Sequence, residues 1–299
     1  MSAYLSDSAE TSYVQGPTTR FAYRRFGTGR GVPLVLALRF RGTVDHWDPA
    51  FLEVLASARD VIVFDNAGCG LSSGRTPDTV AAMADGAVEF IEALGLPRVD
   101  LLGWSMGGAV VQAVALRRPE LVRRLVVAAS GPGGVPGTPP APDRVWEVAG
   151  KPVNDDEDFL YLFFPDAPAA RAAGLASLRR LDTRLGASAS ASASASASAS
   201  ASASASASAV RPESVGAQAA ALGRWGRGED AAWERLGEIA HPVLAAAGAH
   251  DVMVHAFATY AMSQRLADSK VVIYGDAGHG FLFQHPEEFG GEVLRFLAG

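Results

Sequence analysis

The sequence predicts an α/β fold with a mostly parallel central sheet, flanked by helices and interrupted by an inserted helical lid. Short runs rich in Val, Ile and Leu alternate with stretches of helical spacing toward both ends of the chain. These runs lack polar alternation, as strands that are buried on both faces require. Between them, residues 135–238 lose this rhythm and contain helical pieces rich in aromatic residues.

The repeated order of strand, helix and strand implies right-handed crossovers and therefore parallel neighbours in the sheet. Helical spacing, with Gly95 as a stop signal after the second helix, sets the helix limits. The expected strands are residues 21–26, 33–38, 60–64, 99–104, 125–129, 242–247 and 270–274. The expected helices are residues 47–57, 79–94, 105–116, 257–266 and 286–297.

This reading divides the chain into a core made of residues 1–134 and 239–299 and a helical lid insertion at 135–238. An unbroken Ala-Ser alternation occupies residues 187–209 of the insertion. Such small residues cannot bury enough apolar surface to order themselves, so a flexible linker is expected there. Partial helicity is the alternative, because alanine favours helix.

Composition excludes several classes of protein. The net charge of −6 argues against a nucleic-acid partner, and no apolar run reaches the ~18 residues of a membrane span. Cys69 is the only cysteine, which excludes an intrachain disulfide and a Cys-based zinc site. The first eleven residues are polar and do not show the basic and then apolar order of a signal peptide, so a cytoplasmic location is expected. The expected partner is a small-molecule substrate.

The strongest chemical signal is Gly103-Trp104-Ser105-Met106-Gly107, a G-x-S-x-G sequence between an expected strand and an expected helix. In that context the pattern predicts a sharp turn that presents a nucleophilic serine at the carboxyl end of the sheet. Glycines are required on both sides because side chains there would clash with the neighbouring strand and helix. Ser105 is therefore the expected nucleophile.

A serine nucleophile needs a base, and His279 is the favoured one of six histidines. It follows the last expected strand, so it emerges at the same sheet edge as Ser105, and glycines on both sides allow close approach. His250 and His255 are the rivals, whereas His285 precedes a proline at a helix start and is expected to be structural.

Asp251 is the expected acid that orients the histidine. It follows the strand before that of His279, so adjacent parallel strands would place the two loops side by side. The resulting chain order is nucleophile, acid, base. Asp276 is the alternative acid, although its closeness in sequence to His279 favours a role in the turn.

These motifs resemble the α/β-hydrolase fold family over residues 21–297, excluding the insertion, and most resemble small serine esterases and cofactor-free perhydrolases with a helical lid. The loop from Asp65 to Ser72 is similar to a loop of the family and is interpreted as structural, with Cys69 as a packed thiol. The resemblance implies an acyl-enzyme mechanism that needs no metal and no organic cofactor.

One segment departs from the family. Where members usually carry His-Gly, this chain has Leu38-Arg39-Phe40-Arg41-Gly42. By position, the backbone amides of Phe40 and Met106 are expected to form the oxyanion hole, which needs no particular side chain. Arg39 and Arg41 could meet an anionic substrate group, but pairing with Asp45 or Asp48 is the favoured interpretation.

The expected reaction is hydrolysis of a carboxylic ester, thioester or lactone of a moderately hydrophobic small molecule. The residues expected to contact it are Trp104, Phe159, Phe163 and Phe281, with packing in the core as the alternative for most of them. Perhydrolase, haloperoxidase-like or lyase activity and a non-catalytic receptor role remain open alternatives. An Asp-nucleophile dehalogenase or epoxide hydrolase is disfavoured because position 105 is serine.

Overall fold

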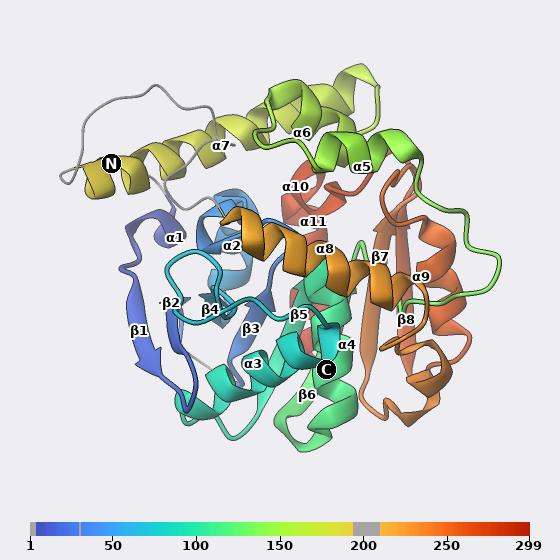
Figure 1. Cartoon of the computed structure of the whole chain (residues 1–299), viewed down its shortest axis with the longest axis horizontal. Coiled ribbons are helices and arrows are strands. Elements are labelled where there is room, and N and C mark those ends of the chain that lie inside the picture. Colours follow the sequence, from blue (N-terminus) through green and yellow to red (C-terminus); the bar gives the residue numbers. More distant parts are fainter. Residues whose placement is uncertain (1–3, 30, 194–209) are drawn as a thin grey trace.

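The computed structural model describes residues 4–29, 31–193 and 210–299 (Figure 1). Within them, eight strands form one sheet in the order β1-β2-β4-β3-β5-β6-β7-β8. Neighbours from β4 to β8 along this order are parallel, whereas β2 is antiparallel to both β1 and β4. The strands are β1 (Ser12–Gln15), β2 (Arg20–Gly27), β3 (Leu34–Ala37), β4 (Asp60–Phe64), β5 (Val99–Trp104), β6 (Val122–Ala128), β7 (Val243–Gly248) and β8 (Ser269–Tyr274).

Helices cover both faces of the sheet, which confirms the predicted fold class. One face carries α2 (Pro49–Ala56), α10 (Phe281–Gln284) and α11 (Pro286–Ala298), whose apolar residues join one core. The other carries α3 (Val80–Ala93), α4 (Met106–Arg117) and α9 (Ala256–Ser263), whose residues join a second core. Short elements complete the core: α1 (Leu5–Ser8) and the 3-10 turns η1 (Val44–His46) and η2 (Pro119–Leu121).

The central strand β3 is apolar along its whole length because alternate residues enter different cores. In β3, Leu34 and Leu36 join the core beneath α2 and α11, while Val35 and Ala37 join the core beneath α3 and α4. All four residues are buried. A parallel strand with both faces covered has no solvent side on which a polar residue would be favoured.

Each expected strand and helix of the core has a counterpart, with ends displaced by a few residues. The largest displacements are in β6, which starts at Val122 rather than at residue 125, and in α9 (Ala256–Ser263), which ends at Ser263 rather than at residue 266. The edge strand β1 was not predicted. Its residues are mostly exposed, so it carries no apolar run that could reveal it.

In the described parts of the range expected to form the lid, four helices separate β6 from β7 in the sequence. They are α5 (Asp143–Ala149), α6 (Asp156–Phe163), α7 (Pro168–Ala193) and α8 (Pro212–Gly226), followed by the 3-10 turn η3 (Trp233–Glu238). Figure 1 shows α5, α6 and α7 lying together along the upper side of the molecule. The Ala-Ser tract begins inside α7, which is helical through Ala193, and residues 194–209 of the tract lie outside the described residues.

Buried polar contacts fix α7 on the core. The Asp48 carboxylate, at the start of α2, accepts a hydrogen bond from Ser177 Oγ at 2.6 Å and two from the Arg180 guanidinium at 2.8 and 2.6 Å. Asp48 has no exposed surface. A buried carboxylate is stable when it is paired and hydrogen-bonded in this way, so this cluster holds α7 against α2.

A search of the described residues for a helix long and apolar enough to cross a membrane finds none.

Candidate active site

Ser105 stands at the turn between β5 and α4 in a strained backbone conformation. Its φ of 57° and ψ of −121° lie where residues other than glycine are rarely found. The surrounding structure enforces it, since the Ser105 N–H donates to Ala128 O at 2.9 Å and its carbonyl accepts from Gly108 N–H at 2.8 Å. The side chain is buried, with 9% exposure, at the carboxyl end of the sheet.

The glycines that flank Ser105 allow three elements to approach closely. A Cβ on Gly107 would collide with the carbonyl of Ala37 in β3, and one on Gly103 would collide with the backbone of Gly107. Neither obstacle is a flexible side chain that could move aside. Both positions therefore require glycine, for the reason that the sequence pattern suggested.

His279 and Asp251 meet through a short hydrogen bond. His279 Nδ1 lies 2.7 Å from Asp251 Oδ2, and both side chains are almost fully buried. A carboxylate oxygen only accepts, so Nδ1 carries the proton and Nε2 is the free lone pair. The other oxygen of Asp251 accepts from the amides of Met253 and Val254, each at 2.8 Å. Three donors therefore fix this carboxylate in one orientation.

Ser105 and His279 line the same cavity of about 280 Å³. His279 Nε2 is buried and has no hydrogen-bond partner among the described residues. The polar lining also includes Arg39, Arg41, His46, Asn154, Asp155 and Asp156. The apolar wall consists of Phe40, Ala149, Pro152, Val153, Phe159, Leu162, Phe163, Leu178, Leu181, Leu185, Val210 and Met253. Much of this wall therefore comes from the inserted helices.

Of the two expected oxyanion donors, Phe40 lines the same cavity as Ser105, and Met106 directly follows Ser105 in the chain. Phe40 follows β3 and lines the cavity with little exposed surface. Met106 is the first residue of α4, so its amide has no acceptor within the helix. The positive end of the helix dipole adds to the potential at this point.

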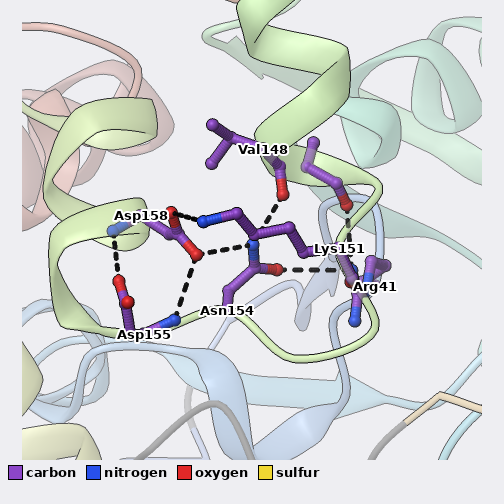
Figure 2. A network of polar contacts seen from close by, with 7 residues as sticks. Arg41, Val148, Lys151, Asn154, Asp155 and Asp158 are labelled. Carbon is purple, nitrogen blue, oxygen red and sulfur yellow. Dashed lines mark hydrogen bonds and ion pairs between the residues drawn. The ribbon is translucent and has the colours of Figure 1, made fainter.

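Among the residues that the structure describes, Arg41 pairs with no carboxylate, so the interpretation that it pairs with Asp45 or Asp48 was wrong. Its guanidinium donates instead to the carbonyl oxygens of Ala149 at 2.9 Å, Lys151 at 2.6 Å and Pro152 at 3.0 Å. Figure 2 shows this arginine and the segment between α5 and α6, where Asn154 and Asp158 bind each other and the surrounding backbone. Arg41 therefore ties the segment after β3 to the segment that forms one wall of the cavity.

The expected partners of the two arginines are engaged elsewhere: Asp48 binds Arg180, and Asp45 binds Arg24 at 2.7 Å. The Arg39 guanidinium carbon lies 5.2 Å from the centre of the Phe163 ring and 5.7 Å from that of Trp104. Burial, with a smaller effect of Arg41, lowers the pKa of Arg39 to about 10. The side chain is thus still a cation at neutral pH.

His46 is a lining residue that the sequence did not single out. Its Nδ1 accepts a hydrogen bond from the Thr43 amide at 3.1 Å. An amide only donates, so in the neutral ring the proton is on Nε2. Burial, with a smaller effect of the Arg39 charge, lowers the pKa of His46 to about 3. His46 is therefore a neutral hydrogen-bond donor in the wall of the cavity.

The four residues expected to contact substrate divide into two pairs. Phe159 and Phe163, on α6, line the cavity. Trp104 and Phe281 have no exposed surface and lie outside its lining, so the expectation for them is corrected. Trp104 is a support instead, because its Nε1 donates to the carbonyl of His279 at 3.0 Å. Phe281 packs on Tyr274 and Phe289 in the core.

The rival residues lie apart from Ser105. His255 accepts from the Phe257 amide at the start of α9, and Asp276 Oδ1 lies 2.9 Å from His285 Nε2 on the surface. His250 is exposed. Cys69 is buried and contacts Thr76 and Gln218, and burial raises the pKa of its thiol. Across the part of the chain that the structure describes, no group of three or more His, Cys, Asp or Glu side chains could hold a metal ion.

Comparisons with known proteins agree with this architecture. A protein from Rhizobium rhizogenes that carries the name carbamate hydrolase RutD is 26% identical over 88% of this chain and 92% of its own length. A 2-hydroxymuconate semialdehyde hydrolase from Pseudomonas sp. is 27% identical over 91% of this chain and 88% of its own. The solved structure of an alpha/beta hydrolase fold protein from Chitinophaga pinensis superposes with a TM-score of 0.83, at 34% identity and with 98% of both chains covered.

The sequence pattern of a whole family matches as well, over residues 40–286, which include Ser105, Asp251 and His279. This range covers most of the sheet and all of the inserted helices. The chain is a member of the alpha/beta hydrolase fold family.

Proposed function

We propose that the protein is a serine hydrolase that cleaves a carboxylic ester of a moderately hydrophobic small molecule, with thioesters and lactones as related substrates. The observation that carries this proposal is the hydrogen bond between His279 and Asp251, which leaves Nε2 of His279 without a partner among the described residues, together with the cavity that His279 and Ser105 both line. That relatives are named hydrolases supports the same reaction type.

The proposed reaction starts when Ser105 Oγ attacks the ester carbonyl carbon and His279 Nε2 takes the hydroxyl proton. The imidazolium that forms is stabilised by the carboxylate of Asp251. The carbonyl oxygen becomes an oxyanion that accepts hydrogen bonds from the amides of Phe40 and Met106. Each such donor is worth about 3 kcal/mol of the barrier.

The tetrahedral intermediate then collapses. The bond to the alcohol oxygen breaks, and His279 returns its proton to the leaving alcohol, which leaves an acyl ester on Ser105. Water repeats the sequence, with His279 as the base again, and releases the acid. The free enzyme is restored without a cofactor taking part in any step.

The inserted helices are proposed to act as the lid of this site. Phe159 and Phe163 of α6, with Leu178, Leu181 and Leu185 of α7, would surround the apolar part of the substrate. An apolar wall excludes water and strengthens the hydrogen bonds to the oxyanion. We also propose a reducing, cytoplasmic setting, which the single buried thiol of Cys69 supports.

A fluorophosphonate probe, which labels activated serines, tests the proposal. Wild type should be labelled and should hydrolyse 4-nitrophenyl acetate. Ser105→Ala should lose labelling and lose hydrolysis by on the order of 10⁶-fold, to background. Ser263→Ala, the same change on the surface of α9, is the control and should behave as wild type. Hydrolysis that survives in Ser105→Ala would refute the assignment.

A further inference from the structure

Arg39 brings an uncompensated positive charge to the cavity of the nucleophile. Within the described residues it takes part in no salt bridge, and its one hydrogen bond is from Nη1 to the Phe40 carbonyl at 2.8 Å. Its Nε is buried without any partner. The two carboxylates of the cavity lining, Asp155 and Asp156, are exposed, and Asp155 is engaged with the Asp158 amide.

This arrangement is costly for the protein on its own. A guanidinium has five N–H donors, of which the described contacts use one. The Arg39 side chain is only partly exposed, and proteins usually offset the cost of withdrawing a cation from water by pairing it with an anion. The rings of Phe163 and Trp104 offset part of it by cation–π attraction. An anion in the cavity would satisfy the donors that remain.

His46, a second polar residue of the cavity lining, could donate a hydrogen bond to the same anion. His46 is a neutral donor whose Nδ1 is occupied by Thr43, which leaves Nε2–H for a ligand. Arg41, in contrast, already uses its guanidinium on the backbone between α5 and α6. One cation and one neutral donor fit a compact, singly charged group, and the largely apolar wall fits the rest of a small organic acid.

We propose that Arg39 is a specificity-determining residue, which binds a free carboxylate on the same small molecule whose ester bond Ser105 attacks. This inference rests on the proposed function, because it names the substrate class of that site. The preferred substrate is then an ester or lactone that also carries a carboxylate, and a neutral ester of the same size is a poorer one.

Matched substrates that differ only between a carboxylate and a primary amide test the proposal. One pair carries the group on the leaving side (4-carboxyphenyl acetate and 4-carbamoylphenyl acetate). The other carries it on the acyl side (4-nitrophenyl monoesters of adipic acid and of its monoamide). In at least one pair, wild type should prefer the acid. Arg39→Gln should lower kcat/KM for that acid by roughly 10- to 100-fold, as expected for loss of a hydrogen bond between charged groups.

The ratio between acid and amide is the diagnostic quantity. Arg39 also binds the Phe40 carbonyl, so its replacement can displace an oxyanion donor and slow every substrate. Arg39→Lys keeps the charge and should retain part of the preference. Arg75→Gln, the same change at an exposed position, should leave both rates unchanged. Equal rates for acid and amide in wild type, or an equal loss for both in Arg39→Gln, would overturn the proposal.

A second measurement separates this inference from the proposed function. Benzoate should slow the labelling of Ser105 by the fluorophosphonate more than benzamide does, in wild type and not in Arg39→Gln. A Ser105 that is never labelled would refute the proposed function. A labelled Ser105 that benzoate and benzamide protect equally would refute only the role of Arg39.

Discussion

At the scale of single residues, the geometry of the site depends on Asp251. This carboxylate accepts two backbone amides through one oxygen and His279 Nδ1–H through the other, and it is buried. The amides fix its position, and the position fixes which nitrogen of His279 carries the proton. The tautomer of His279 is thus determined by a loop between β7 and α9 rather than by anything near the serine.

Asp251→Asn should therefore lower kcat for ester hydrolysis by about 10⁴-fold while the fold is retained. The side-chain amide of the variant can donate to Nδ1 of His279, which would favour the tautomer with the proton on Nε2. A protonated Nε2 cannot accept the proton of Ser105. Steady-state kinetics with circular dichroism would measure both effects. Asp276→Asn, at the alternative acid, is the matched control and should retain activity. The reverse outcome would transfer the role to Asp276.

At the scale of elements, the serine turn is held in place by the close packing of β3, β5 and α4. Gly107 touches the end of β3, and Gly108 of the same helix touches Ser130 after β6. The strained Ser105 conformation persists because these contacts leave no room for relaxation. The strain thus belongs to the packing of three elements rather than to the turn alone.

Gly107→Ala should destabilise the protein by about 1–3 kcal/mol, since the added methyl group meets backbone that cannot move aside. It should also reduce labelling of Ser105 by displacing the turn. Gly216→Ala, at an exposed position of helix α8 with open space at its Cβ, should stabilise the protein by about 0.5–1 kcal/mol. Urea unfolding of both variants checks the contrast, and equal effects at the two positions would contradict it.

At the scale of the whole molecule, the inserted helices and the sheet share one core. Leu160, Leu178 and Leu181 from the insertion pack in the same cluster as Leu102 and Trp104 from β5. The wall of the cavity is therefore continuous with the core beneath the active site. A change in the position of α6 or α7 would alter both the cavity and the packing around Trp104, which supports His279.

Stability of the whole molecule should depend on pH through Asp65. This carboxyl joins the segments after β3 and β4, because it accepts from the amides of Val44 and Leu71. Burial, which outweighs these hydrogen bonds, raises its pKa to about 7, from 3.8. A raised carboxyl pKa means that the folded state binds the proton more tightly than the unfolded state does. The contribution of the Asp65 proton to the free energy of unfolding is therefore fully present below about pH 4 and is lost as the pH rises through 7.

The free energy of unfolding of wild type, taken relative to Asp65→Asn, should therefore be lower at pH 8 than at pH 5. Urea titrations at the two pH values measure it, and Asp78→Asn, at an exposed carboxylate, controls for the general effect of losing a charge. A relative stability that is the same at both pH values, or higher at pH 8, would show that Asp65 is ionised without penalty in the fold.

The order of strands along the chain, the serine turn and the loops of Asp251 and His279 could be predicted from the sequence because each has a local signal. Apolar runs indicate buried strands, and glycines indicate where backbone must approach backbone. Parallel neighbours then place the ends of β5, β7 and β8 at one edge of the sheet. The edge strand β1 had no such signal, since its side chains are mostly exposed.

The composition of the cavity was decided only by the tertiary structure. Asp48 was an obvious partner for Arg39 in the sequence, yet it binds Ser177 and Arg180, which lie 129 and 132 residues away in the chain. Because α7 packs against α2, Asp48 pairs with Arg180 rather than with Arg39. Arg39 therefore lies in the cavity of Ser105 without a carboxylate partner among the described residues. The sequence alone indicated which residues would perform the proposed chemistry, because backbone periodicity and turns are local. The environment of those residues depends on competition between partners distant in the chain, and only the packed structure resolves that competition.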